Sequence, residues 1–162
     1  MKIVTIGVYG SDEAAFFNAL QRAHVDTFCD IRRRRGLRGS EYAFANSARL
    51  QKRLRELGIR YLHVPDVAPS DKLRAAQAKA DEAEHVARRK RTVLNDAFIE
   101  GYRRECLAHF NSRKFVDQFG PNAKVVALFC VEREPAACHR SLLDERLKHD
   151  LRVKVHHLLA AP

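Results

Sequence analysis

The chain has 162 residues, and its 30 Lys and Arg against 20 Asp and Glu give a formal net charge of +10. This length and the 46% apolar content fit one globular domain with its own core. The positive surplus favours an anionic partner such as a nucleotide, phosphate or nucleic acid, although a solvated basic surface has the same composition. We expect no membrane contact, no cofactor, and a cytoplasmic location with reduced cysteines, because no stretch approaches a membrane span and the N-terminal residues resemble a strand and not a secretory leader.

The first third of the chain predicts strands alternating with helices. Short, β-branched apolar runs predict strands at residues 3–6, 25–31 and 59–64. Ser11 is expected to cap a helix between the first two strands, since acidic residues follow it in the first turn. Asn46 or Ser47 is expected to cap a second helix. This alternation is typical of a parallel sheet with helical crossovers.

Helices then dominate until a fourth strand. Residues 70–120 show only helical segments, among them a charged stretch at 73–90 with so little apolar face that we interpret it as a solvated helix. A strand at 124–131, a helix from about Cys138 and a strand at 153–158 complete the chain. The prediction is a single α/β domain over residues 1–162, a Rossmann-like three-layer sandwich with about five mostly parallel strands. The segment 70–120 is a helical insertion packed on it.

Polar residues whose side chains could act in catalysis or ligand binding follow the predicted strands. In such sheets ligands bind at the carboxyl ends of the strands, so these residues would meet on one rim. Asp30 and Glu132 are candidate general acid and base groups, and Cys138 with His139 is the alternative catalytic pair. Candidate substrate or anion ligands are Gly7, Arg32, His63 and Arg140. Asp30 and Arg32 share a strand face, so they can equally pair with each other.

The stretch from Leu128 to Arg140 is the most informative part of the chain. It runs from a buried strand into Cys138, His139 and Arg140 at a helix N-terminus, where the helix dipole favours a thiolate or a bound anion. Cys138 is otherwise a small buried residue.

A basic loop follows the second predicted strand. Together with Arg32, residues Arg33, Arg34, Arg35 and Arg38 form a run of five arginines, and Tyr42 follows it. Arginines beside an aromatic ring are typical of a patch for a phosphate backbone with stacked bases. A solvated basic loop is the simpler interpretation of Arg33 to Arg35.

Three sharper motifs are absent from the sequence. A cysteine phosphatase loop needs an arginine six residues after its cysteine, but Ala136 follows Cys130 at that distance. Cys130, Cys138, His139 and His63 could together bind zinc, but there is no closely spaced cysteine pair, so no metal site is predicted. Neither a Walker loop nor a dinucleotide glycine fingerprint occurs.

At these positions the chain resembles the uncharacterised family called domain of unknown function 488. The matching pieces are residues 5–7, 30–32, 61–65 and 128–140, and residues 39–47 look like a subgroup hallmark. The resemblance implies a Rossmann-like fold and supports the site without naming a reaction. Many relatives carry histidine and serine where this chain has Val8 and Tyr9, and the charged segment near 71–91 is a further subgroup feature.

Two functions remain open on the sequence alone. The first is an enzyme-like domain that binds a nucleotide or nucleic-acid phosphate and performs glycosidic-bond or other hydrolytic chemistry. The second is a non-catalytic basic module that binds nucleic acid through the arginine loop and residues 88–91. The cysteine and histidine metal site is a third alternative.

Overall fold

A computed structural model describes residues 1–160 and shows one five-stranded sheet in which every pairing is parallel. The strand order is β3-β2-β4-β1-β5. The strands are β1 (Lys2–Ile6), β2 (Thr27–Asp30), β3 (Arg60–His63), β4 (Val125–Phe129) and β5 (Val155–Leu158). The predicted α/β fold with about five parallel strands is therefore confirmed.

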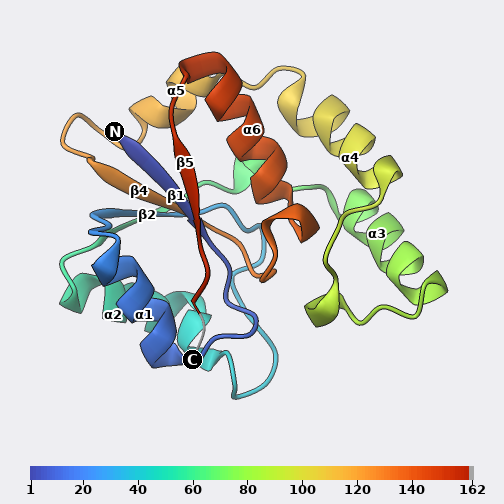
Figure 1. Ribbon diagram of the computed structural model, residues 1–162, viewed down its shortest axis with the longest axis horizontal. Helices are drawn as coiled ribbons and strands as arrows, with labels where there is room; N and C mark the ends of the chain where they lie inside the picture. Colours follow the sequence, from blue (N-terminus) through green and yellow to red (C-terminus); the bar gives the residue numbers. More distant parts are fainter. Residues whose placement is uncertain (161–162) are drawn as a thin grey trace.

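Helices cover both faces of this sheet, which makes three layers (Figure 1). On one face lie α1 (Glu13–Arg22) and α2 (Ser47–Glu56), and on the other lie α5 (Ser112–Asp117) and α6 (His139–Leu151). Two helices of the insertion, α3 (Asp71–Ala83) and α4 (Asp96–Tyr102), extend outward beside α6 (Figure 1). The placement of helices on two faces follows from right-handed crossovers between parallel strands. The chain moves across the sheet in one direction before β3 and in the opposite direction after it, so the connecting helices change face.

The core lies between the central strands and the two helical layers. Residues of β2 and β4 are almost completely buried, and a cluster of aromatic rings from α1, β2 and β4 joins Phe16, Phe28 and Phe129. Each fully buried ring of this kind contributes on the order of 2 to 3 kcal/mol relative to an exposed one. The sheet edge that carries the site is therefore held by a rigid apolar centre.

Several predicted boundaries move by one to a few residues. Asp12, not Ser11, is the N-cap of α1, because its Oδ1 accepts the Ala15 N–H at 2.7 Å while the Ser11 hydroxyl donates to the Val8 carbonyl. Asn46 occupies the N-cap position of α2, but its Oδ1 accepts from Leu37 N at 2.6 Å and so anchors the preceding loop. The strand predicted at 25–31 is shorter in the structure.

The carboxyl ends of the first four strands meet at one edge of the sheet. The register aligns Ile6 and Asp30 with Phe129, and His63 with Asp30. The chain leaves β1 toward α1 on one face and leaves the adjacent β4 toward α6 on the other face (Figure 1). Such a divergence of neighbouring strands is the topological switch point at which open α/β sheets bind ligands.

The helices of residues 1–160 include none with both the length and the apolar character needed to cross a membrane.

Candidate functional site

A cavity of about 840 Å³ opens beside the carboxyl ends of β2 and β4. Its volume is within the range of small-molecule sites, which span roughly 300 to 1,000 Å³. Eight arginines line it against four carboxylates: Arg32, Arg33, Arg34, Arg38, Arg74, Arg88, Arg89 and Arg91 with Asp71, Asp81, Glu82 and Glu132. The lining also includes Cys130, Cys138 and His139. The cavity therefore combines a positive wall with the thiol and imidazole groups of the β4–α6 connection.

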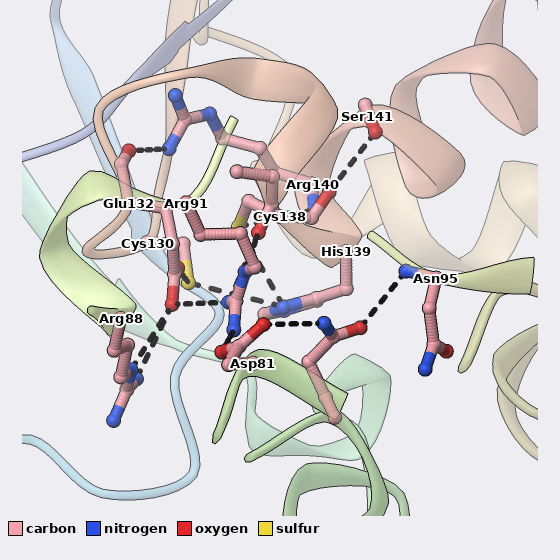
Figure 2. Close-up of polar contacts among 12 residues, drawn as sticks. Asp81, Arg88, Arg91, Asn95, Cys130, Glu132, Cys138, His139, Arg140 and Ser141 are labelled. Atoms are coloured by element: carbon pink, nitrogen blue, oxygen red, sulfur yellow. Dashed lines mark hydrogen bonds and ion pairs between the residues drawn. The ribbon is translucent and has the colours of Figure 1, made fainter. Parts of the chain in front are cut away.

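A chain of polar contacts joins the insertion to the end of β4 (Figure 2). Gln77 of α3 accepts from Asn95 N at 3.0 Å and donates to Asp81 Oδ1 at 2.8 Å. Arg91 then donates to Asp81 Oδ2 at 2.7 Å and to Glu132 Oε1 at 3.1 Å. This chain fixes α3 as one wall of the cavity, although α3 has few apolar residues.

Glu132 is the buried carboxylate of this cavity and is only 4% exposed. Burial alone would raise its pKa, but the nearby guanidinium groups of Arg88 and Arg91, with a backbone hydrogen bond and the His139 ring, together bring the pKa below its ordinary value. Arg88 donates to Glu132 Oε1 at 3.3 and 3.4 Å, and the Cys130 thiol donates to Oε2 at 3.4 Å. Glu132 is thus an ionised acceptor and is poorly suited to act as a general acid.

Asp30 and Arg32 form a buried, two-pronged ion pair with exposures of 0% and 4%. Arg32 donates Nε to Oδ1 at 2.8 Å and Nη2 to Oδ2 at 2.7 Å, and the Tyr61 hydroxyl donates to Oδ2 at 2.9 Å. The Arg32 guanidinium also lies 4.4 Å above the Phe129 ring. Arg32 reaches the cavity, whereas Asp30 is not in the lining formed by the described residues. In the structure Asp30 orients Arg32 and has both carboxylate oxygens occupied.

Three other candidates hold the rim together from outside the cavity lining given by residues 1–160. Arg140 is 1% exposed and donates to the backbone carbonyls of Glu132 and Arg133, the latter at 2.7 Å. A side chain at Gly7 would overlap the Glu132 carbonyl, so glycine permits this close approach of two loops. The ring of His63 contacts the Arg32 carbonyl through Nε2 at 2.8 Å. The geometry gives Gly7, His63 and Arg140 positioning contacts and no direct access to a ligand in this cavity.

The basic loop divides between the cavity and the rest of the surface. Arg33, Arg34 and Arg38 are exposed and line the cavity, whereas Arg35 lies beside Tyr61. Tyr42 is 4% exposed, and its hydroxyl accepts from Gly10 N at 3.1 Å. The Tyr42 ring therefore offers no open face on which a base could stack.

A family model for a domain of unknown function, DUF488, matches residues 13–147. The chain belongs to this family. A search of curated proteins finds no match, and neither does a search of solved structures. Membership in DUF488 therefore comes with no described activity, and the function must be argued from the site.

Val8 and Tyr9 follow Gly7 in the loop after β1. Both backbone N–H groups donate to the Val131 carbonyl, at 3.1 and 3.0 Å. Val8 is fully buried, while Tyr9 lines the cavity and lies under the Arg89 guanidinium at 5.5 Å from its ring centroid. In this DUF488 domain the position after β1 therefore offers an aromatic ring to the cavity.

Sequence reasoning missed the contribution of α3 to the site. Asp71, Arg74, Ala78 and Asp81 lie on one face of this helix and line the cavity. The interpretation of residues 73–90 as a solvated helix was wrong for this face, since Gln77 and Asp81 are buried at 4% and 7% exposure. A search for an apolar stripe does not detect a helix face that packs through hydrogen bonds. The sequence signal was the pair Gln77 and Asp81, two polar residues spaced four positions apart on a helix.

Proposed function

We propose that this protein binds a phosphate-bearing ligand of nucleotide size in the cavity beside β2 and β4. The observation that carries the proposal is the excess of eight arginines over four carboxylates on one concave surface of about 840 Å³. Arginine is the side chain best suited to phosphate, because its planar guanidinium can donate two parallel hydrogen bonds.

Not every arginine is already neutralised. Arg33 has only a long contact, at 3.4 Å, with the Ala68 carbonyl, and Arg38 has no ion pair among the described residues. The buried Nη1 of Arg32 lacks a hydrogen-bond partner within residues 1–160. Unsatisfied donors of this kind favour an anion, since a buried donor without a partner costs free energy.

The contacts support ligand binding more than either reaction considered from the sequence. Asp30 is engaged by Arg32 and Tyr61, so it is a poor partner for Glu132 in a two-carboxylate hydrolysis. The thiol of Cys138 accepts from Arg140 N at 3.5 Å and is 1% exposed, which restricts its access to a substrate.

A panel of ligands tests the proposal by thermal shift and calorimetry. Nucleoside mono- and diphosphates should raise the unfolding temperature, and the parent nucleosides should not, because a ligand that binds only the folded state stabilises it. Arg33→Gln should weaken binding about tenfold, in line with the loss of one charged hydrogen bond. Arg55→Gln is the matched control, since Arg55 is exposed on α2 away from the cavity lining.

The same panel includes a short single-stranded oligonucleotide. Binding of the oligonucleotide alone, with affinity that falls steeply with salt, would replace the proposal with the nucleic-acid module. If neither nucleotides nor the oligonucleotide bind, the anion site is refuted.

A further inference from the structure

Two sulfurs and an imidazole nitrogen meet in the lining of the cavity. His139 Nδ1 lies 3.8 Å from the sulfur of Cys130 and 3.8 Å from the sulfur of Cys138. All three side chains are buried, and their nearest ligand atoms lie within 4.8 Å of one another. Figure 2 shows these side chains converging beside Glu132.

The local fold explains why residues eight and nine positions apart come together. Cys130 directly follows β4, and Cys138 is the N-cap residue of α6, with His139 as the first residue of that helix. Between them the chain folds back through the short helical turn Pro135–Ala137, where Cys138 N donates to the Pro135 carbonyl at 3.0 Å. Arg140 clamps the same loop through its two carbonyl contacts. The spacing in the sequence hides this cluster because it does not follow the usual short cysteine motif.

The separation between the nitrogen and each sulfur is close to that in a tetrahedral zinc site. Zinc binds sulfur at about 2.3 Å and nitrogen at about 2.0 to 2.1 Å, so neighbouring sulfur and nitrogen ligands lie about 3.6 Å apart. Both observed separations of 3.8 Å need a shift of only a few tenths of an ångström to match. Nδ1 is the ring nitrogen in contact with the two sulfurs, whereas Nε2 has no hydrogen-bond partner within residues 1–160.

We propose that Cys130, Cys138 and His139 bind one Zn²⁺ ion, with both sulfurs as thiolates and Nδ1 as the third ligand. Two thiolates and a divalent cation sum to zero charge, which makes the ion compatible with a buried position. The two thiol protons are released to solvent when the metal binds.

The fourth coordination position would lie toward the cavity, because all three ligand residues are part of its lining. Three protein ligands and an open position distinguish catalytic zinc sites from the closed, four-ligand structural ones. The arginines that line the cavity would then hold an anion next to the zinc ion, which is a Lewis acid. The metal site goes beyond the proposed anion binding and is measured without any nucleotide present.

Cobalt(II) binding to the reduced, chelator-treated full chain provides the test. Tetrahedral Co²⁺ with thiolate ligands gives charge-transfer absorption and visible bands, so the spectrum reports both geometry and sulfur ligation. We expect one equivalent of Co²⁺ to bind and Zn²⁺ to displace it. Cys130→Ser and Cys138→Ser should each weaken binding by at least about 100-fold, because even an outer-shell partner contributes about 10- to 100-fold.

Cys106→Ser is the matched control, since Cys106 is a partly buried free cysteine outside the cluster. Its cobalt spectrum should equal that of the unaltered protein. A second measurement needs no variant at all: Zn²⁺ should slow alkylation of Cys130 and Cys138, read by peptide mass spectrometry, and leave Cys106 unchanged. Absence of a thiolate–cobalt band in the folded, reduced protein, or zinc protection that does not include both cluster cysteines, overturns the metal site.

Discussion

Arg91 donates to Glu132 at 3.1 Å although the two residues lie 41 positions apart in the chain. The same guanidinium donates to Asp81 at 2.7 Å and, through Nε and Nη2, to the Ala137 carbonyl. Arg91 thereby links α3, the end of β4 and the turn before α6. One side chain of the insertion thus connects three of the segments that border the cavity.

Removing Arg91 should destabilise the protein strongly. Arg91→Ala leaves Asp81 and Glu132 without this partner, and their side chains are only 10% and 6% exposed. Glu132 keeps its contact with Arg88, and Asp81 keeps its hydrogen bond from Gln77, but both lose their buried cation. Removing one member of a buried ion pair costs about 3 to 5 kcal/mol, and we expect the lower end of this range here, seen as a lower free energy of unfolding in urea. The neighbouring Lys90→Ala is the control and should change stability by less than about 0.5 kcal/mol, because Lys90 is exposed. A loss below about 1 kcal/mol for Arg91→Ala would show that the network is not a structural link.

Gly7→Ala should be among the most damaging small substitutions in the chain. The new methyl group would overlap the Glu132 carbonyl and lie 2.9 Å from Arg140 Nη1, and a backbone carbonyl held by a buried arginine has little freedom to move. Overpacking usually costs about 1 to 3 kcal/mol, and we expect at least the upper end here.

Gly36→Ala is the matched control for this substitution. A methyl group at Gly36 meets no atom within 4 Å, so stability should be almost unchanged. Equal chemical denaturation midpoints for the two variants would mean that the β1 and β4 loops separate at little cost.

The sequence predicted the sheet well because two central strands, β1 and β4, are largely apolar runs that carry their own signal. Ile3 and Leu128 lie in such runs, and the alternation with helices determines parallel pairing. The sequence pattern also predicted that the carboxyl ends of the strands would meet, and the alignment of Asp30 with His63 confirms this. These features depend on local pattern and general topology.

Which side chains pair with one another at the strand ends could not be predicted in the same way. From the sequence, Asp30 and Arg32 could have a site role or pair with each other, and the structure shows both carboxylate oxygens of Asp30 hydrogen-bonded to Arg32. The approach of Arg91 to Glu132 depends on the path of the whole insertion. Contacts between residues so far apart in the sequence have no periodic signature. The sequence therefore predicted the residues at the strand ends but not that α3 lines the cavity.

The pairing of Asp30 with Arg32 predicts a clear non-additivity. Asp30→Ala leaves the buried Arg32 guanidinium without its carboxylate partner and should lower the free energy of unfolding by about 3 to 5 kcal/mol. The double variant with Arg32→Met should be less destabilised than Asp30→Ala alone, because no unpaired charge is then buried. Urea denaturation of the four proteins of this double-mutant cycle gives the coupling. If the losses of unfolding free energy are additive, Asp30 and Arg32 are not energetically coupled, and Asp30 would be a free carboxylate.

Asp26 should make folding stability depend on pH in the acidic range. Its Oδ2 accepts from Lys124 N and Val125 N at 2.9 Å each, and Oδ1 accepts from the Thr27 hydroxyl at 2.8 Å, so it joins the starts of β2 and β4. Partial burial alone would raise the pKa of Asp26, but these hydrogen bonds to the carboxylate together outweigh burial and lower it. A depressed folded-state pKa means that the stabilisation is fully present above the unfolded value, about 3.9, and is lost as pH falls through the lower folded value.

Asp26→Asn should therefore lower the free energy of unfolding by about 1 to 2 kcal/mol at pH 6, a charged-hydrogen-bond value reduced for partial exposure. The difference from the unaltered protein should shrink as the pH is lowered below about 4, because the carboxyl group then becomes neutral in both states. Asp117→Asn is the control, as Asp117 is exposed at the end of α5 and should show no such pH-dependent gap. Urea denaturation at a series of pH values measures both variants. A gap for Asp26→Asn that stays constant down to pH 2 would mean that the carboxylate charge contributes nothing to the join between β2 and β4.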